Sequence, residues 1–268
     1  MSDLILPPDP PKGLRRNLLS EKYEKQGFVL GTFLEIPAPQ LVELLGLAGF
    51  DFVVIDREHG AIGLEKTEEL IRAAATTDIV PLVRVAACDP ALVRQPLDMG
   101  AGGIHVPQIN SAEAAELAVR SAKFHPRGER GLQPFVRAAS FRDYPTAEFL
   151  EESNENTVIV LHIEGTEGVA AFDAIAEVEG VDVAFVGPYD LSQSLGIPGM
   201  VQSPLVRREM MKIIERTRDR KLAVGTFCDD VRGALEWKKL GVTYLTVSLD
   251  AAMFVSTAKR IVGQIKQQ

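Results

Sequence analysis

Cysteine is scarce in this chain of 268 residues: Cys88 and Cys228 are the only two, and they lie far apart without metal-ligand spacing. Such a pair predicts neither a disulfide framework nor a thiolate metal site, and it is typical of reduced thiols in or near a core. No apolar stretch approaches the roughly 20 residues that a membrane span requires, and the first residues lack a basic region followed by an apolar signal core. We therefore expect a cytoplasmic protein without a membrane span.

Positive charge is also in deficit, with 29 Lys and Arg against 37 Asp and Glu, a net charge of -8 and a pI near 5.2. This balance argues against nucleic-acid binding, which needs a clustered positive surface. A small anionic substrate remains allowed, because local arginines can outweigh a diffuse negative field. Hydrophobic residues make up 46% of the chain, and no compositional shift marks a linker. We expect a single domain over residues 1–268.

Short apolar runs alternate with helical patterns along the chain. The expected strands cover residues 28–34, 50–55, 80–85, 103–106, 157–163, 181–186, 222–225 and 244–248. Nearly every strand is followed by a helix, which matches a closed parallel (β/α)8 barrel, the TIM barrel. A doubly wound open sheet is the alternative fold, but no glycine-rich phosphate turn follows the first strand.

Other segments frame this alternation. An extended arm is expected over residues 7–11 and a short amphipathic helix over 14–26, lying across one end of the domain. Residues 123–156 break the rhythm, with a helix near 144–154. A connection of this length is usually functional or part of an interface.

Two carboxylates follow neighbouring apolar runs. Glu164 closes the run 157–163, and Asp190 comes shortly after the run 181–186. A helical stretch over 167–179 can carry the chain back, so that the second strand lies parallel to the first. Both acids would then face the same barrel mouth, which predicts a site for a hard divalent cation. Both acids equally fit helix N-terminal caps, where free amides and the helix dipole stabilise a carboxylate. For Asp190, that helix is a short one over 191–195.

Polar residues concentrate at the predicted carboxyl ends of the strands, where TIM-barrel active sites lie. They are Glu35, Asp56, Glu58, His59, Arg84, Gln108, His162, Glu164, Tyr189, Asp190, Thr226 and Ser248. Polar groups in a barrel mouth must be hydrogen-bonded or ligated, so this concentration favours a site over a packed plug. Structural alternatives remain open for single residues. Arg84 can serve only as a salt bridge to Asp56, and His59 can be an exposed loop histidine. His105, inside a strand, is expected to be a satisfied core histidine.

Six segments together resemble the metal-dependent pyruvate aldolases that include 4-hydroxy-2-oxoheptanedioate aldolase and 2-dehydro-3-deoxyglucarate aldolase. They are Asp56-Arg-Glu-His59, Pro81-Leu-Val-Arg84-Val, Leu97-Asp98-Met-Gly-Ala101, Pro126-Arg-Gly-Glu-Arg-Gly131, Ile163-Glu164 and Gly187-Pro-Tyr-Asp-Leu-Ser192. The correspondence runs in order, with similar spacing, from Gly27 to Ala258. Each segment is modest by itself, whereas the ordered set is specific.

The resemblance implies a role for each matched position. Glu164 and Asp190 would bind Mg²⁺, Mn²⁺ or Co²⁺ and leave positions for water and a 2-oxo acid. Arg84 would lie against the keto oxygen and, with the metal, stabilise the enolate. His59 would be the base, paired with Asp98 as a dyad.

The implied reaction is the reversible cleavage of a 4-hydroxy-2-oxo acid to an aldehyde and pyruvate, or a close 2-oxo acid, through an enolate. No predicted strand interior carries a lysine placed to form a Schiff base. The turn Gly187-Pro188-Tyr189 would bind the oxo acid's carboxylate. His162 stands where these aldolases usually have a substrate-contacting glutamine, Tyr189 replaces a small residue, and Arg57 replaces a common glycine. These departures leave the aldehyde open.

Two other functions are weighed against this one. A citryl- or malyl-thioester lyase would need a place for coenzyme A, and no basic stretch clearly suits its phosphates. A non-catalytic barrel that binds a 2-oxo acid would not need the base, so the presence of His59 and Asp98 argues against it. The resemblance also implies a homohexamer built from dimers, in which the carboxyl-terminal helix packs on a neighbouring subunit. Residues 251–265 are apolar enough for this exchange, but they can equally close their own barrel.

Overall fold

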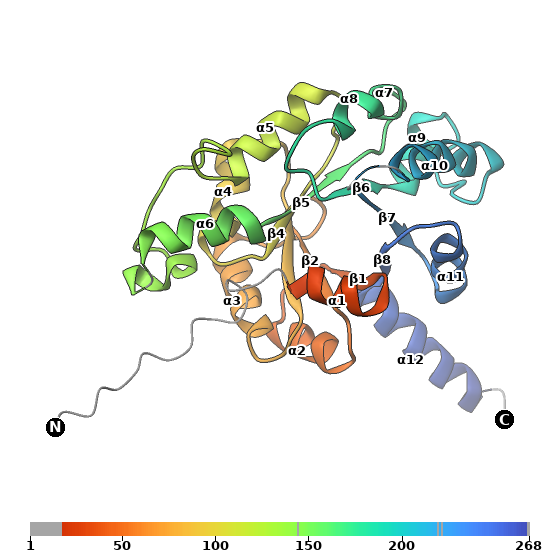
Figure 1. Ribbon diagram of the computed structural model, residues 1–268. Coiled ribbons are helices and arrows are strands. Elements are labelled where there is room, and N and C mark those ends of the chain that lie inside the picture. Colours follow the sequence, from red (N-terminus) through yellow and green to blue (C-terminus); the bar gives the residue numbers. More distant parts are fainter. Residues whose placement is uncertain (1–17, 144, 219, 221, 267–268) are drawn as a thin grey trace.

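The computed structural model describes residues 18–143, 145–218, 220 and 222–266. Eight parallel strands close into a barrel in sequence order, with β8 paired to β1 (Figure 1). The strands are β1 (Val29–Leu34), β2 (Phe52–Asp56), β3 (Val80–Arg84), β4 (Gly103–Val106), β5 (Val158–His162), β6 (Val183–Val186), β7 (Ala223–Cys228) and β8 (Tyr244–Leu249). The predicted (β/α)8 barrel is confirmed, and the open sheet is wrong.

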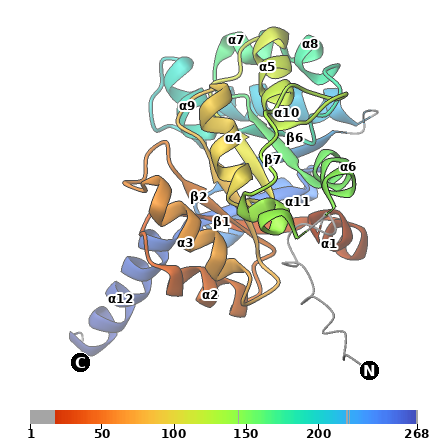
Figure 2. The same cartoon turned by 90° about the vertical axis from the view of Figure 1, so that its left-hand side faces the viewer.

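Helices surround the barrel on its outer side (Figures 1 and 2). They are α1 (Leu18–Gln26), α2 (Pro39–Leu47), α3 (Leu64–Ala74), α4 (Pro90–Asp98), α5 (Ala112–Ala122), the 3-10 helix η1 (Arg137–Arg142), α6 (Thr146–Asn156), α7 (Thr166–Ala170), α8 (Phe172–Ala176), α9 (Pro188–Ser194), α10 (Pro204–Thr217), α11 (Val231–Lys239) and α12 (Asp250–Lys266). In the described part of the chain, none of them has the length and apolarity of a membrane span. The predicted arm and residues 14–17 of the predicted first helix lie outside the described residues.

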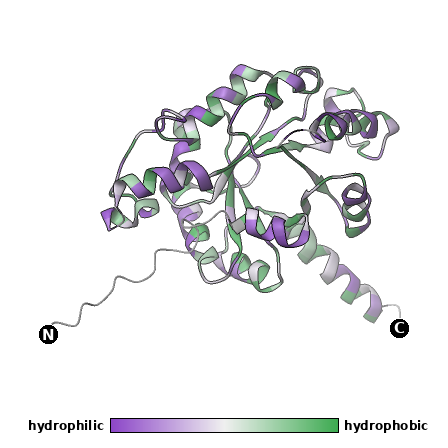
Figure 3. Cartoon of the chain, viewed as in Figure 1, coloured by the Kyte–Doolittle hydropathy of each residue, from purple (hydrophilic) through white to green (hydrophobic). Residues whose placement is uncertain are grey.

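Both faces of the strands are buried, and their side chains alternate between two cores. On β2, Phe52 and Val54 join the cluster inside the barrel, whereas Val53 and Ile55 join a cluster beneath the helices. All four are fully buried, and the hydrophobic colouring of the central strands in Figure 3 reflects this. The next inward position after Val54 is Asp56, so the interior changes from apolar to polar at the carboxyl end of the strand.

Helix α1 lies at the opposite end of the barrel. Leu19 is 5% exposed and belongs to the inner cluster, together with Val29, Val158 and Tyr244 from the first residues of three strands. Helix α1 therefore lies across the amino-terminal end, as predicted, beside an open pocket whose lining includes Leu19, Val158 and Tyr244. The polar mouth is left at the carboxyl ends of the strands.

Two helices near the predicted metal site differ from the prediction. The single helix expected over 167–179 is divided into α7 and α8, because Ala171 leaves the helical conformation at φ -83° and ψ 1°. The short helix expected over 191–195 begins earlier, at Pro188, whose ring fixes a φ suited to the first helical position. Asp190 therefore lies inside the first turn of α9.

Helix α12 extends away from the barrel (Figures 1 and 2). It contacts β1 and β8 near its start, and its later apolar side chains are exposed, including Phe254 at 73% and Ile265 at 70%. Figure 3 shows hydrophobic and hydrophilic residues mixed along it. Within the described residues, α12 does not cover the barrel as the other helices do.

Substitution at Gly31 tests the packing of the inner core. A Cβ atom there would lie 2.2 Å from the Phe52 ring, so we expect Gly31→Ala to lower the free energy of unfolding by about 2 kcal/mol. A Cβ atom on Gly131, in an exposed loop, would meet none of the described residues within 4 Å, so Gly131→Ala should change stability by less than about 0.5 kcal/mol. Urea denaturation of both variants measures this difference, and equal stabilities would contradict the packing described.

Candidate active site

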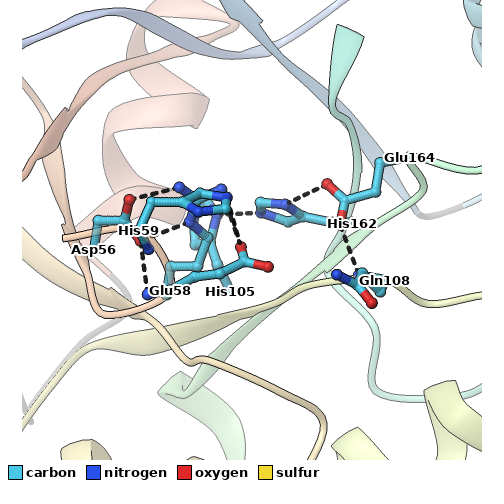
Figure 4. Close-up of polar contacts among 8 residues, drawn as sticks. Asp56, Glu58, His59, His105, Gln108, His162 and Glu164 are labelled. Carbon is cyan, nitrogen blue, oxygen red and sulfur yellow. Dashed lines mark hydrogen bonds and ion pairs between the residues drawn. The ribbon is translucent and has the colours of Figure 1, made fainter. Parts of the chain in front are cut away.

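The register of the strands brings the polar residues of the mouth together. Asp56 on β2 is the partner of Arg84 on β3, and Arg84 is the partner of His105 on β4. His162 ends β5, next along the barrel. Figure 4 shows the Asp56 turn on one side and Glu164 with Gln108 on the other, with His162 pointing at Glu164.

Arg84 is the cation of this mouth, held by two acids and a ring. Its Nε donates to Asp56 Oδ1 over 2.8 Å, and its Nη2 donates to Oδ2 over 2.6 Å. Its Nη1 lies 3.3 Å from Glu58 Oε2, and its guanidinium lies 4.7 Å from the centre of the Phe33 ring. The salt bridge to Asp56 is confirmed. The Arg84 guanidinium carries five N–H donors, and its contacts with Asp56 and Glu58 use one from each nitrogen. Two N–H groups therefore remain.

The ion pair keeps both partners charged. Burial by itself would raise the pKa of Asp56, but the hydrogen bonds from Arg84 and the backbone outweigh it and hold that pKa below its ordinary value. Burial would lower the pKa of Arg84, but Asp56, Glu58 and Glu164 raise it. Burial also raises the pKa of Glu58, against the effect of Arg84.

Asp56 also shapes the turn that carries His59. Its Oδ1 accepts the backbone N–H groups of Glu58 at 3.0 Å and His59 at 3.3 Å. A Cβ atom on Gly60 would lie 2.4 Å from the Asp56 carbonyl oxygen, so the tight turn requires glycine there. The side chain of His59 is 61% exposed, and its Nε2 lies 3.8 Å from Glu58 Oε2. His59 is thus an exposed loop histidine, as the structural alternative allowed, and it stands on the turn that follows β2.

Glu164 is a buried carboxylate with one donor on each oxygen. Its Oε1 accepts the backbone N–H of Gln108 over 2.8 Å, and its Oε2 lies 3.3 Å from His162 Nδ1. Gln108 has a left-handed φ of 56°, an uncommon conformation for a residue other than glycine. Burial alone would raise the pKa of Glu164, but His162, the Gln108 amide and Arg84 lower it below its ordinary value. Glu164 is therefore ionised.

Glycine at position 187 keeps space beside this carboxylate. A Cβ atom on Gly187 would lie only 2.8 Å from Glu164 Oε2. Because glycine has no side chain, the space beside this oxygen stays open. Gly187 is the N-cap of α9, and Asp190 follows in its exposed first turn. Since β5 and β6 are neighbours, the two acids extend from adjacent strand ends.

The helix-cap alternative for both acids is wrong. The N-cap residues of the two helices concerned are Gly165 before α7 and Gly187 before α9, and neither cap has a side-chain hydrogen bond. Glu164 precedes its cap, and Asp190 lies inside its helix. Neither carboxylate is a cap, although the first turn of α9 is a position at which the helix dipole favours the charge of Asp190.

The two acids suit a hard cation that is only partly enclosed by protein. Among the described residues, no group of three or more His, Cys, Asp and Glu side chains forms a metal cage. Mg²⁺ and similar ions commonly use one or two carboxylates and complete their shell with water or substrate. The ionised carboxylate of Glu164, the space at Gly187 and the carboxylate of Asp190 in the helix turn after the neighbouring strand suit such an ion.

Within the single chain described, Asp98 is bonded to a residue other than His59, and the His59–Asp98 dyad stays a prediction. Asp98 is the last residue of α4, and its Oδ1 accepts from Arg130 Nη2 over 2.7 Å. A helix that connects parallel strands returns the chain to their amino ends, so its last residue lies away from the mouth. The acid beside His59 is instead Glu58.

Tyr189 and His162 occupy different environments. The Tyr189 hydroxyl donates to Asp229 Oδ1 over 2.7 Å, and this bond raises the pKa of Tyr189 to about 12. Its ring is 47% exposed, whereas the His162 side chain is 1% exposed. His105 is a satisfied core histidine, as predicted, with hydrogen bonds to His162 and Tyr244.

Three participants have no role assigned by the sequence. Glu58 is a neighbour in the Asp56–His59 segment, and its place at a strand end is its only signal. The contact of the Gln108 amide with Glu164 depends on a left-handed backbone conformation, which the residue type does not predict. The hydrogen bond of Tyr244 to His105 can be recognised only when the inward-facing positions of β8 and β4 are known.

Acidification tests the Asp56–Arg84 pair. We expect Asp56→Asn to lower the free energy of unfolding by about 3 kcal/mol at pH 7, because it leaves the Arg84 charge buried without its partner. The folded pKa of Asp56 is below its unfolded value, so its stabilisation is present above about pH 4 and is lost as the pH falls through the folded pKa. Urea titrations at several pH values should show the two proteins converging in acid. The matched control is Asp173→Asn, an ion-paired acid that is 62% exposed, which should cost less than about 1 kcal/mol.

Comparisons with known proteins agree with this geometry. Residues 30–257 match the family described as HpcH/HpaI aldolase/citrate lyase. The chain is 34% identical over 237 residues to hydroxypyruvate/pyruvate aldolase of Pseudomonas aeruginosa, covering 88% of each chain. It is 34% identical over 241 residues to 5-keto-4-deoxy-D-glucarate aldolase of Escherichia coli K12, covering 89% of this chain and 92% of that one. The solved structure of citrate synthase SbnG superposes with a TM-score of 0.84 at 33% identity, covering 93% of this chain and 98% of that one. The predicted resemblance and the carbon–carbon lyase class are confirmed: the chain belongs to the HpcH/HpaI aldolase/citrate lyase family.

Proposed function

We propose that this protein is a divalent-metal-dependent aldolase that reversibly cleaves a 4-hydroxy-2-oxo acid to an aldehyde and pyruvate or a close 2-oxo acid. The observation that carries the proposal is the ionised Glu164 beside Gly187, with Asp190 in the helix turn that follows. The names of two relatives, a hydroxypyruvate/pyruvate aldolase and a 5-keto-4-deoxy-D-glucarate aldolase, support the substrate class.

Glu164 and Asp190 would hold Mg²⁺, Mn²⁺ or Co²⁺. When bound, the ion supplies a Lewis acid that polarises the keto group of the 2-oxo acid. The hydrogen bonds from Gln108 and His162 hold the Glu164 carboxylate in one orientation. The turn Gly187-Pro188-Tyr189, which adjoins Glu164, is where we assign the carboxylate of the oxo acid.

Arg84 would stabilise the negative charge that develops on the keto oxygen as the enolate forms. Its two contacts to Asp56 and its position over Phe33 fix the guanidinium plane before substrate arrives. A donor fixed in advance stabilises a transition state without the cost of reorganisation. The N–H groups not used by Asp56 and Glu58 are available for this oxygen.

His59 would be the general base. Its Nε2 takes the proton of the 4-hydroxyl, C4 becomes the carbonyl carbon of the aldehyde, and the C3–C4 electron pair passes to the enolate. Protonation at C3 then gives the 2-oxo acid. Glu58, 3.8 Å from Nε2, is the acid placed to stabilise the imidazolium in this step.

A Schiff base is not needed in this mechanism. Lys123 is buried, but its Nζ donates to the carbonyl oxygens of Asn154 and Thr157, in the segment that joins α5 to β5. It therefore does not reach the mouth as a nucleophile. The chemistry of the enolate falls to Arg84 and the metal ligands.

The recognition of the aldehyde would involve Tyr189. Its hydroxyl donates a hydrogen bond to Asp229. This bond connects the turn after β6 to the turn after β7 at the rim of the barrel. His162, by contrast, is almost fully buried and is bonded to Glu164. We therefore assign His162 to the support of the metal ligand, and Tyr189 with Asp229 to the acceptor side.

The assembly is also part of the proposal. The exposed apolar side chains of α12, Phe254 and Ile265 among them, support a homohexamer in which this helix packs on a neighbouring subunit. The strands of one barrel span residues 29–249, which supports a single domain. The free thiols of Cys88 and Cys228 support a cytoplasmic location.

Metal removal and two substitutions test the mechanism. Complete chelation should abolish release of pyruvate from 4-hydroxy-2-oxo acids, and added Mg²⁺, Mn²⁺ or Co²⁺ should restore it. Glu164→Gln should lose both metal binding and turnover, whereas His59→Asn should bind metal normally and turn over about 10²–10⁴-fold more slowly. Calorimetry and a pyruvate assay measure the two properties separately. Full activity of the metal-free protein would refute the mechanism.

Substitutions on α12 test the assembly. Phe254→Glu with Ile265→Glu places charge on one face of the exposed helix, so the mass from light scattering should fall from that of an oligomer toward that of a monomer. Ser256→Glu adds one negative charge to the opposite face and should leave the mass unchanged. A monomeric parent protein at micromolar concentration would contradict the proposed hexamer.

A further inference from the structure

Four buried groups form a continuous chain of hydrogen bonds beneath the mouth. The Tyr244 hydroxyl lies 2.8 Å from His105 Nε2, and His105 Nδ1 lies 2.9 Å from His162 Nε2. His162 Nδ1 lies 3.3 Å from Glu164 Oε2. None of the four residues is more than 7% exposed. The chain crosses the barrel interior from β8 through β4 to β5 and ends at a proposed metal ligand.

The chemistry of its two ends gives this chain one direction. The Glu164 carboxylate only accepts hydrogen bonds, so His162 carries a proton on Nδ1, and a ring with a single proton then has Nε2 as its acceptor. His105 must then carry its proton on Nδ1 and accept at Nε2. The donor to that last nitrogen is the Tyr244 hydroxyl. Every polar atom along the chain is satisfied with both imidazoles neutral.

Burial fixes the protonation of the two groups at the far end of the chain from Glu164. Complete burial lowers the pKa of His105 well below its ordinary value and raises that of Tyr244 well above it, so the imidazole stays neutral and the phenol keeps its proton. The rings are also fixed in place: Tyr244 stacks on Phe52 with centroids 4.3 Å apart, and His162 stacks on Phe185 at 4.6 Å.

A neutral donor suits a metal ligand better than a cationic one. A histidinium at His162 would repel a divalent ion bound to the same carboxylate. A neutral imidazole orients the carboxylate and leaves its charge for the ion, as second-layer hydrogen bonds do in metal sites. His162 can act this way only while another group donates to its Nε2, and His105 is that group.

We propose that His105, oriented by Tyr244, is a positioning residue that holds the His162 ring with its Nδ1–H directed at Glu164 and thereby sets the affinity of the divalent-cation site. The part that concerns the cation rests on the proposed function. The arrangement of protons does not, and it can be measured without metal.

Nitrogen NMR of the metal-free protein tests the proton arrangement. The chain has four histidines, and single substitutions assign their ring signals. We expect His105 to show a protonated Nδ1 and an unprotonated Nε2, the reverse of the tautomer that free histidine favours in water, because its Nδ1 donates to His162 and its Nε2 accepts from Tyr244. An Nε2–H tautomer at His105 would overturn the proposal.

Titration with Mn²⁺ alone, followed by calorimetry, tests the effect on the cation. His105→Leu removes the donor to His162 and should weaken binding at least about 10-fold. His105→Gln can donate to His162 and accept from Tyr244, so its Mn²⁺ affinity should stay within about 3-fold of that of the parent protein. Loss of a supporting group typically weakens metal binding about 10–100-fold. Tyr244→Phe should weaken binding by a smaller factor than His105→Leu. The control Thr246→Val removes a buried hydroxyl that is bonded to the Thr226 carbonyl, outside the chain, and should not change the affinity.

The outcomes separate this inference from the proposed function. Wild-type protein that binds no Mn²⁺ would refute the metal mechanism itself. Wild-type binding that is equally tight in folded His105→Leu would overturn the positioning role alone. If His105→Leu does not fold, Tyr244→Phe decides instead: unchanged Mn²⁺ affinity together with an unchanged His105 tautomer would overturn the role assigned to the chain.

Discussion

The bidentate contact between Asp56 and Arg84 is the interaction on which the mouth of this barrel depends. It joins the ends of two adjacent strands, and the same carboxylate accepts the amides that form the next turn. One side chain thus fixes both the plane of the guanidinium that would face an enolate oxygen and the loop that presents His59. Removing Asp56 would disturb the cation and the base together, although Asp56 itself contacts neither reacting atom in the mechanism.

The charges of the mouth are unequal, and this imbalance has a chemical use. Asp56, Glu58 and Glu164 surround Arg84, and Asp190 lies nearby on α9. A negatively charged 2-oxo acid would be repelled by these acids without a compensating ion. A divalent cation on the proposed ligands Glu164 and Asp190 would reverse the local field, so we expect metal binding and substrate binding to be coupled. The same argument explains why a chain of net charge -8 can serve an anionic substrate.

Much of this arrangement follows from the sequence, and the exceptions have physical causes. The alternation of apolar runs and helices predicts the barrel, and the barrel in turn places Asp56, Arg84, Glu164 and Asp190 at one end. The hydrogen bond of Asp98 to Arg130 could not be predicted, because the resemblance gives residue types in order, whereas this contact depends on where α4 ends. The division of α7 from α8 depends on the backbone at Ala171. The histidine chain could not be predicted either, since it requires the register that sets His105 against His162 and Tyr244.

The glycine at position 225 carries a consequence for how this interior can evolve. A Cβ atom there would lie 2.8 Å from the Phe185 ring and 2.9 Å from the Tyr244 ring. The absence of a side chain on β7 is therefore what gives room to the two aromatic rings that adjoin the histidines. Related chains that gain a side chain at this position must shrink a ring at 185 or 244 at the same time. The two changes should therefore appear together across lineages, and a smaller side chain at position 244 would remove the phenol that ends the buried chain.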